Sequence, residues 1–151
     1  MVELDEIDIL ILRLVIHDCS LSVREISRLL QKSPTTIAKK IQRLRDSGVI
    51  ERCEAILDYK KLGYNIMALI LINVEGAHIE DVEKMLSSEP NVRAVYDITG
   101  EFDVAIIALF RDVDELDRFV KRLLKNPYVK RSVTNVIFKA VKDGVNIDVF
   151  G

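Results

Sequence analysis

Residues 33–48 decide the fold of the N-terminal part, and they read SPTTIAKKIQRLRDSG. Ser33 can accept hydrogen bonds from the free backbone N–H groups of a helix start, and Pro34 fits the first helical position. Gly48 can adopt the left-handed conformation that ends a helix. Between them, apolar residues recur at helical spacing at Ile37, Ile41 and Leu44. The stretch therefore predicts a helix with one buried face.

The opposite side of this helix is polar and basic. Its outward side chains have two interpretations, an ordinary solvated surface or a recognition helix in the major groove of DNA. The candidate DNA-binding residues are Ser33, Thr35, Thr36, Lys39, Lys40, Gln42 and Arg43. Lys39 and Arg43 are the best candidates for contacts to bases or phosphates.

The preceding segment favours the recognition helix. Ser22 and Glu25 have the spacing of a capping box, and the apolar residues after Ser22 predict a short amphipathic helix that ends near Gln31. Two such helices joined by a tight turn form a helix-turn-helix. From Arg24 to Arg45 there are seven Lys or Arg residues and one acidic residue, a net charge of +6 in a chain of net charge −2. A basic patch on an acidic protein is typical of nucleic-acid binding.

The flanking segments complete the N-terminal part. Residues 1–18 have the apolar periodicity of a helix that packs across the other two. Residues 49–58 are rich in β-branched residues, which predicts a strand or wing, and residues 59–65 form a linker. We therefore expect a winged-helix-like head at residues 1–50 and a strand and hinge at 51–65.

Residues 66–151 change from helices to alternating strands and helices. The predicted strands are residues 67–74, 92–98, 102–110 and 129–141, and the predicted helices lie around 79–86 and 113–124. Residues 145–150 could add an edge strand. This order is βαββαβ, a ferredoxin-like unit, and the fold class is α+β. Its strands are apolar on both sides while helices cover only one, which predicts a homodimer formed sheet to sheet.

Composition excludes several classes of protein. Without a basic, apolar-cored leader or an apolar run of membrane length, the chain is expected to be soluble and cytoplasmic. Cys19 and Cys53 are too few and too far apart to suggest a disulfide framework or a zinc site, so we expect small buried or half-buried side chains there. We expect no cofactor and no catalytic or metal site.

The full length of the chain resembles the Lrp/AsnC, or feast/famine, transcription regulators. The matching stretches are LDEIDILILRLV (4–15), VREISRLLQKSPTTIAKKIQRLRDSGVI (23–50), ILDYKKLGY (56–64), PNVRAVYDITGEFDVAII (90–107) and NPYVKRSVTNVIFK (126–139). The helix-turn-helix alone is weakly specific, but its combination with this hinge and the TGEFD loop is strongly specific.

The resemblance implies a dimer that assembles into higher oligomers such as octamers, and a small effector, an amino acid in many members. The effector-binding residues it implies are Tyr96, Thr99, Gly100, Glu101, Phe102, Asp103 and Thr134. In this mapping, Gly100 lets the effector approach the backbone closely, and the Asp103 carboxylate faces the ammonium group of the bound amino acid. Glu101 favours a neutral or basic amino acid over an acidic one.

Alternatives remain open at this stage. Thr99-Gly100-Glu101 is also an ordinary hairpin turn, and Asp103 could instead satisfy nearby backbone N–H groups. The rival functions are an effector-sensing or assembly module without DNA binding, and a tetrapyrrole decarboxylase of related fold. The decarboxylase is disfavoured, since the chain has only two histidines, at 17 and 78, and no glycine-rich phosphate loop.

Overall fold

The computed structural model of the chain describes residues 2–144, 146–147 and 149–150. Its contacts divide the chain into two units, residues 1–56 with 143–151 and residues 57–142. No helix in the described part of the chain is long and apolar enough to cross a bilayer.

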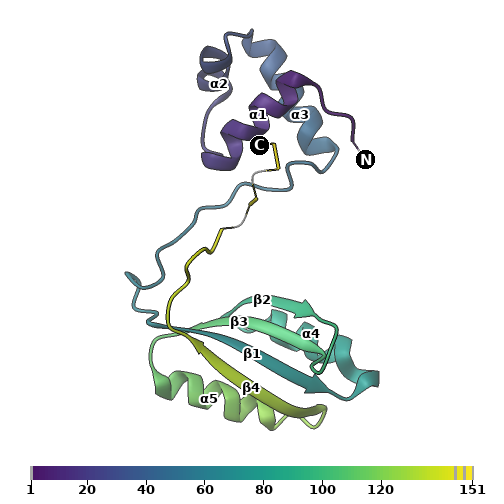
Figure 1. The fold of residues 1–151 in the computed structure, drawn as a ribbon, viewed down its shortest axis with the longest axis vertical. Helices are drawn as coiled ribbons and strands as arrows, with labels where there is room; N and C mark the ends of the chain where they lie inside the picture. Colours follow the sequence, from purple (N-terminus) through teal and green to yellow (C-terminus); the bar gives the residue numbers. More distant parts are fainter. Residues whose placement is uncertain (1, 145, 148, 151) are drawn as a thin grey trace. The chain divides into compact units, whose positions relative to one another are not determined.

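The first unit is a three-helix head (Figure 1). Its helices are α1 (Glu6–His17), α2 (Val23–Leu30) and α3 (Pro34–Asp46). Ser22 and Glu25 form the predicted capping box, and Ser33 caps α3 by accepting a hydrogen bond from the Thr36 N–H at 3.1 Å. Gly48 follows α3 with φ +73°, as its stop signal predicts. The core of the head consists of Ile11, Leu12, Ile26, Ile37, Ile41 and Leu44.

Two predictions about this unit are corrected. The first helix does not span residues 1–18, because Asp5 and Asp8 form a capping box that starts α1 at Glu6. Residues 49–58 form no strand or wing hairpin, since no segment of the described chain pairs with them and residues 51–58 are exposed.

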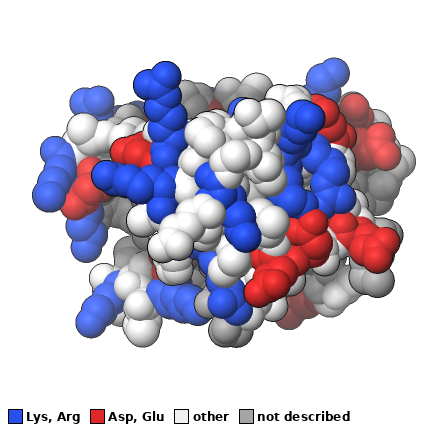
Figure 2. Space-filling model, turned by 90° about the horizontal axis from the view of Figure 1, so that it is seen from above, with Lys and Arg blue, Asp and Glu red and all other residues white. Residues whose placement is uncertain are grey.

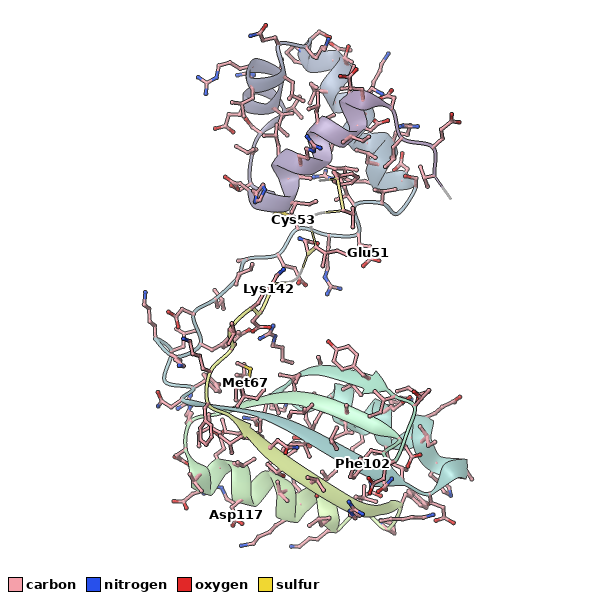
Figure 3. All side chains as sticks on the ribbon, in the orientation of Figure 1. Glu51, Cys53, Met67, Phe102, Asp117 and Lys142 are labelled. Atoms are coloured by element: carbon pink, nitrogen blue, oxygen red, sulfur yellow. A yellow bond between two sulfur atoms is a disulfide. The ribbon has the colours of Figure 1, made fainter. Side chains whose placement is uncertain are left out.

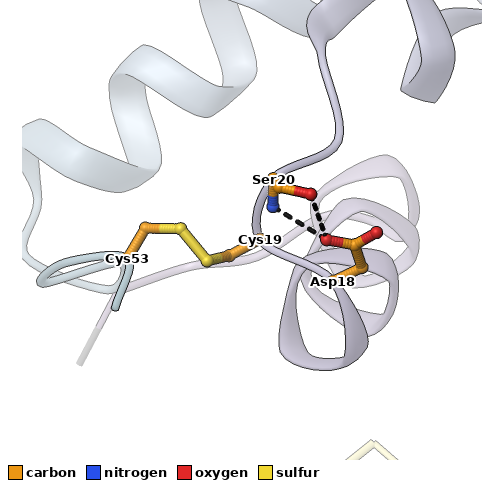
Figure 4. Close-up of a disulfide and its surroundings, with 4 residues drawn as sticks. All are labelled: Asp18, Cys19, Ser20 and Cys53. Carbon is orange, nitrogen blue, oxygen red and sulfur yellow. Dashed lines mark hydrogen bonds between the residues drawn. A yellow bond between two sulfur atoms is a disulfide. The ribbon is translucent and has the colours of Figure 1, made fainter. Parts of the chain in front are cut away.

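The prediction for the two cysteines was wrong. Cys19 and Cys53 form a disulfide, with their Cα atoms 5.8 Å apart (Figure 4). Cys19 is half-buried at the corner between α1 and α2, whereas Cys53 is exposed in the segment after α3. Their separation of 34 residues is bridged because the three helices fold back on one another and bring the two ends of the helix-turn-helix together.

The second unit is the predicted βαββαβ fold (Figure 1). Its elements are β1 (Ile66–Val74), a short 3-10 turn (Gly76–His78), α4 (Ile79–Ser87), β2 (Val92–Asp97), β3 (Val104–Phe110), α5 (Val113–Leu124) and β4 (Val129–Ile137). The strands pair antiparallel in the order β2-β3-β1-β4. Both helices cover one face of this sheet.

The last strand is shorter than predicted. It ends at Ile137 rather than residue 141, because β1, its partner, begins at Ile66 and offers no backbone to pair beyond that point. In the predicted edge strand at 145–150, residues 145 and 148 lie outside the described residues, and the described ones are not in a strand.

The two faces of the sheet differ. Ala68, Ile70 and Ile72 of β1 point toward α4 and α5 and are fully buried. Met67 and its alternate neighbours on β1 occupy the other face, which no helix covers; Figure 3 shows Met67 there, on the side away from α5. Alternation along the strands therefore produces one closed and one open apolar face.

Candidate nucleic-acid interface and effector loop

The outer face of α3 is open to solvent. Thr35, Lys39 and Gln42 are exposed on it, while Thr36 is half-buried at the first turn, where its hydroxyl lies 2.8 Å from that of Ser33. Gln42 donates a hydrogen bond to the Asp46 carboxylate at 2.7 Å. Within the described residues Lys39 has no ion pair, so its ammonium group is available to a phosphate.

Two other cations of α3 are held by α1. Lys40 forms ion pairs with Asp5 and, at 3.3 Å, with Asp8, and Arg43 forms an ion pair with Asp8. The Asp8 side chain is 0% exposed, whereas those of Lys40 and Arg43 are 18% and 48% exposed. Arg43 also donates to the Glu3 carbonyl at 3.4 Å. These contacts fix the crossing of α3 on α1.

The ion pairs perturb two side chains. The hydrogen bond from Lys40 is the main cause that lowers the pKa of Asp5 to about 2, helped by the Asp8 backbone N–H. The same contact with Asp5 raises the pKa of Lys40 above its ordinary value. Both groups therefore remain charged at neutral pH.

Five further cations of the helix-turn-helix are exposed. None of them forms an ion pair within the described residues, in contrast to Lys40 and Arg43. They are Arg24, Arg28, Lys32, Lys39 and Arg45. Figure 2 shows Lys and Arg side chains at many points of the face seen from above, with Asp and Glu side chains among them. Of the seven Lys and Arg residues that the sequence assigned to the basic surface, five therefore have no ion pair in the described structure.

The turn between α2 and α3 is rigidly built. Gln31 adopts the left-handed conformation, with φ 52° and ψ 42°, and the Ser27 hydroxyl donates to the Lys32 carbonyl at 2.5 Å. The Lys32 N–H also bonds the Ser27 carbonyl at 3.1 Å. The turn sets the angle at which α3 leaves α2.

The predicted effector loop connects β2 and β3. Gly100 has φ +113°, a conformation that a side chain would strain. Asp103 is tied to the sheet by its backbone and by its Oδ2 atom, which accepts the Val74 N–H at 2.8 Å. One of the two carboxylate oxygens of Asp103, Oδ2, therefore has the alternative role expected from the sequence, which is to accept a backbone N–H. The other oxygen, Oδ1, has no hydrogen bond in the described structure.

Two residues missed by the sequence reasoning hold this loop. Asn73 donates to the Glu101 carbonyl at 2.5 Å, and Arg131 donates to the Glu101 carboxylate at 3.1 Å. The Arg131 guanidinium also lies 5.0 Å from the centre of the Phe102 ring, which Figure 3 places at one end of the sheet. Asn73 and Arg131 are cross-strand partners on β1 and β4, so only the strand register reveals them.

The remaining predicted effector residues lie on opposite faces of the sheet. Tyr96 pairs with Ala105 on the open face and is 55% exposed. Thr134 pairs with Ile70 and shares the face that the helices cover. Within one chain, the structure thus gathers Thr99 to Asp103 but does not bring Thr134 to them.

Known protein families match both units. The C-terminal residues 67–147 match the Lrp/AsnC ligand binding domain, and residues 4–51 match a winged helix-turn-helix DNA-binding domain. A DNA-binding head joined to a ligand-binding domain defines a transcription regulator that carries its own sensor. The chain belongs to the Lrp/AsnC family of transcription regulators, which confirms the predicted family, the predicted α+β fold class and the predicted role as a transcription regulator.

Relatives extend over nearly the whole chain. An uncharacterized HTH-type transcriptional regulator of Pyrococcus furiosus is 38% identical, covering 97% of this chain and 99% of its own. HTH-type transcriptional regulator FL11 of Pyrococcus horikoshii is 32% identical, with 98% of each chain covered.

Solved structures share the fold. Bacillus subtilis LrpC superposes with a TM-score of 0.85 at 26% identity, covering 93% of this chain and 99% of its own. A transcriptional regulator of Neisseria meningitidis, solved as a complex with L-Met, has a TM-score of 0.91 at 24% identity, with 96% of each chain covered.

Proposed function

We propose that the chain binds duplex DNA as a homodimer, with α3 of each copy in the major groove. The observation that carries this proposal is the selective pairing on α3, where α1 neutralises Lys40 and Arg43 and leaves Lys39 free on the outer face. Thr35 and Gln42 beside Lys39 supply hydrogen-bonding groups for base edges. The exposed cations around them supply phosphate contacts. Lys40 and Arg43 then act chiefly in placing the helix.

The open face of the sheet supports the homodimer. Along β1 and β3 this face carries only apolar side chains: Met67, Leu69 and Leu71 on β1, and their partners Leu109, Ile107 and Ala105 on β3. An apolar sheet face of this kind is stabilised by burial against another surface, and a second copy presents the same face. The two-fold symmetry of such a pair places two recognition helices to read two half-sites.

The effector is proposed to be an amino acid bound at residues 99–103. The L-Met in the Neisseria relative supports an amino acid, and Gly100 and the free Oδ1 of Asp103 provide a site for its ammonium group. Because Arg131 already neutralises Glu101, a neutral amino acid fits this loop best. Binding where dimers meet would couple the ligand to higher assembly.

Gel shifts test the DNA proposal. A pool of duplexes should be bound at low ionic strength, and Lys39→Ala should weaken binding while Lys84→Ala, an exposed lysine of the other unit, should not. Equal binding by both variants would contradict the assignment of α3.

Calorimetry tests the effector proposal separately. Titration with each of the twenty amino acids should reveal binding that Asp103→Asn removes and the exposed control Asp114→Asn retains. No heat from any amino acid at millimolar concentration would refute this part alone. We further propose that the protein acts in the cytoplasm and catalyses no reaction.

A further inference from the structure

The Cys19–Cys53 disulfide is the one firm attachment of the segment that leaves the head. Ile50 is the last residue anchored by the helices, since it packs on the head core and its N–H bonds the Leu44 carbonyl at 3.0 Å. Residues 51–56 are all exposed. Within the described chain, no hydrogen bond or ion pair joins them to α1, α2 or α3; Arg52 pairs only with Glu54, at 2.7 Å. The disulfide alone therefore fixes this stretch.

We propose that this disulfide is a redox switch that sets the length of free chain between the DNA-reading head and the sheet unit. The second unit begins at Leu57. When the disulfide is formed, residues 54–56 are free, which is about 10 Å of extended chain. When it is reduced, residues 51–56 are free, which is about 20 Å. The other connection runs from Ile137, the end of β4, to Asp143, where the head unit resumes; its five residues span about 17 Å of extended chain and so allow most of this change.

The chemistry of the site fits a reversible switch. Cys53 is exposed and Cys19 is half-buried, so an external thiolate reaches the Cys53 sulfur first. Exposed disulfides are more readily reduced than buried structural ones.

An external disulfide, either of low molecular weight or in a dithiol oxidoreductase, oxidises the two thiols by accepting their two electrons. The Cys53 thiolate attacks the external disulfide and releases one thiolate, which leaves a mixed disulfide on Cys53. The Cys19 thiolate then attacks Cys53 and releases the second thiolate. Two electrons pass from the protein to the external pair, and the protons of the two cysteines pass to the released thiolates. An external dithiol reverses both steps.

The consequence for DNA rests on the proposed function. In the oxidised dimer, the short free chains hold the two heads near one distance from each other. In the reduced dimer, the longer free chains let the heads reach several distances, and the effective concentration of the second head at any one half-site is lower. The oxidised dimer therefore discriminates strictly between half-site spacings, and the reduced dimer tolerates a change of spacing.

Limited proteolysis tests the switch without DNA. The wild-type protein is equilibrated with oxidised glutathione or with excess dithiothreitol, free thiols are titrated, and trypsin cleavage is followed by mass spectrometry. Cleavage after Arg52 should be roughly ten-fold faster in the reduced protein, because that peptide bond becomes free to open. Cleavage after Lys60 and Lys61, beyond the freed stretch, serves as the internal control and should change little. Two free thiols after oxidation, or equal cleavage after Arg52, would overturn the switch.

A spacing series tests its consequence. DNA selected from a random pool by the oxidised protein is lengthened by about 5 base pairs, half a helical turn, between its half-sites. The oxidised protein should lose at least about ten-fold more affinity on this insertion than the reduced protein. Equal losses would overturn the link to spacing. Failure of either form to bind DNA would instead overturn the proposed function, while the proteolysis result judges the switch independently.

Discussion

Replacing Asp8 by Asn probes how the head separates structural from DNA-binding cations. Asp8 is fully buried, accepts the Asp5 N–H at 2.9 Å and pairs with both Lys40 and Arg43. Asn can keep the backbone hydrogen bond but not the charge. Removing one partner of a buried ion pair destabilises a protein by about 3–5 kcal/mol. Because water reaches both cations in part, we expect a loss of about 2–3 kcal/mol for Asp8→Asn.

The assay is thermal unfolding followed by far-ultraviolet circular dichroism, with Glu6→Gln as the matched control. Glu6 lies in the same turn of α1, is exposed and has no ion pair in the described structure. For a head of this size the loss in Asp8→Asn corresponds to a fall in Tm of roughly 10–20 °C. If Asp8→Asn melts within about 2 °C of Glu6→Gln, the ion pairs to α3 do not stabilise the head.

The same variant changes DNA binding in an informative way. Lys40 and Arg43 lose their buried partner and become available to phosphates. Up to two contacts added per head should steepen the plot of log binding constant against log salt by at most about 1.8 per head. Binding without sequence preference should strengthen while discrimination between sequences falls, because α3 is placed less firmly. An unchanged salt slope would contradict the view that α1 withholds these cations from DNA.

Four further predictions concern stability, charge and assembly. Gln31→Gly should raise the free energy of unfolding by about 0.5–1 kcal/mol, because glycine adopts φ 52° without strain; a destabilised variant in urea denaturation would contradict this. The pKa of the Asp5 carboxyl, followed by NMR, should be about 2. Its contribution to the free energy of unfolding is therefore present above the unfolded pKa of 3.8 and is lost as the pH falls toward 2. A measured pKa near 3.8 would show that the Lys40 contact is absent. The disulfide closes a loop of 34 residues, so the double variant Cys19→Ser and Cys53→Ser should lose up to about 4 kcal/mol, and equal stability of reduced and oxidised wild type would contradict this. Leu69→Lys, on the open sheet face, should convert the dimer to a monomer in sedimentation, and an intact dimer would exclude that face as the interface.

Local signals were sufficient to predict most of the elements. The Ser22 and Glu25 capping box, the Ser33 cap with Pro34 and the glycine after α3 act within one turn of chain, so the sequence pattern alone indicates them. The order βαββαβ followed from the alternation of apolar strands with amphipathic helices. The predicted strand bounds erred at the ends, because pairing partners rather than propensity decide where a strand stops.

Contacts between distant residues could not be predicted in this way. The disulfide depends on how the three helices fold back, and the ion pairs of Asp8 depend on how α3 crosses α1. Likewise, Arg131 meets Glu101 only through the register of β4 on β1. The face on which Thr134 lies also depends on that register, which the resemblance to a family did not supply.

The salt dependence of binding to random-sequence duplex DNA tests the central claim most directly. Five free cations per head predict binding at low ionic strength, with a slope of log binding constant against log salt of up to about −4.5 per head and twice that for a dimer. Lys39→Ala should make that slope shallower by about 0.9 per head. A protein that ignores duplex DNA at low salt, or a slope that Lys39→Ala leaves unchanged, would contradict the assignment of α3 as the DNA-reading helix.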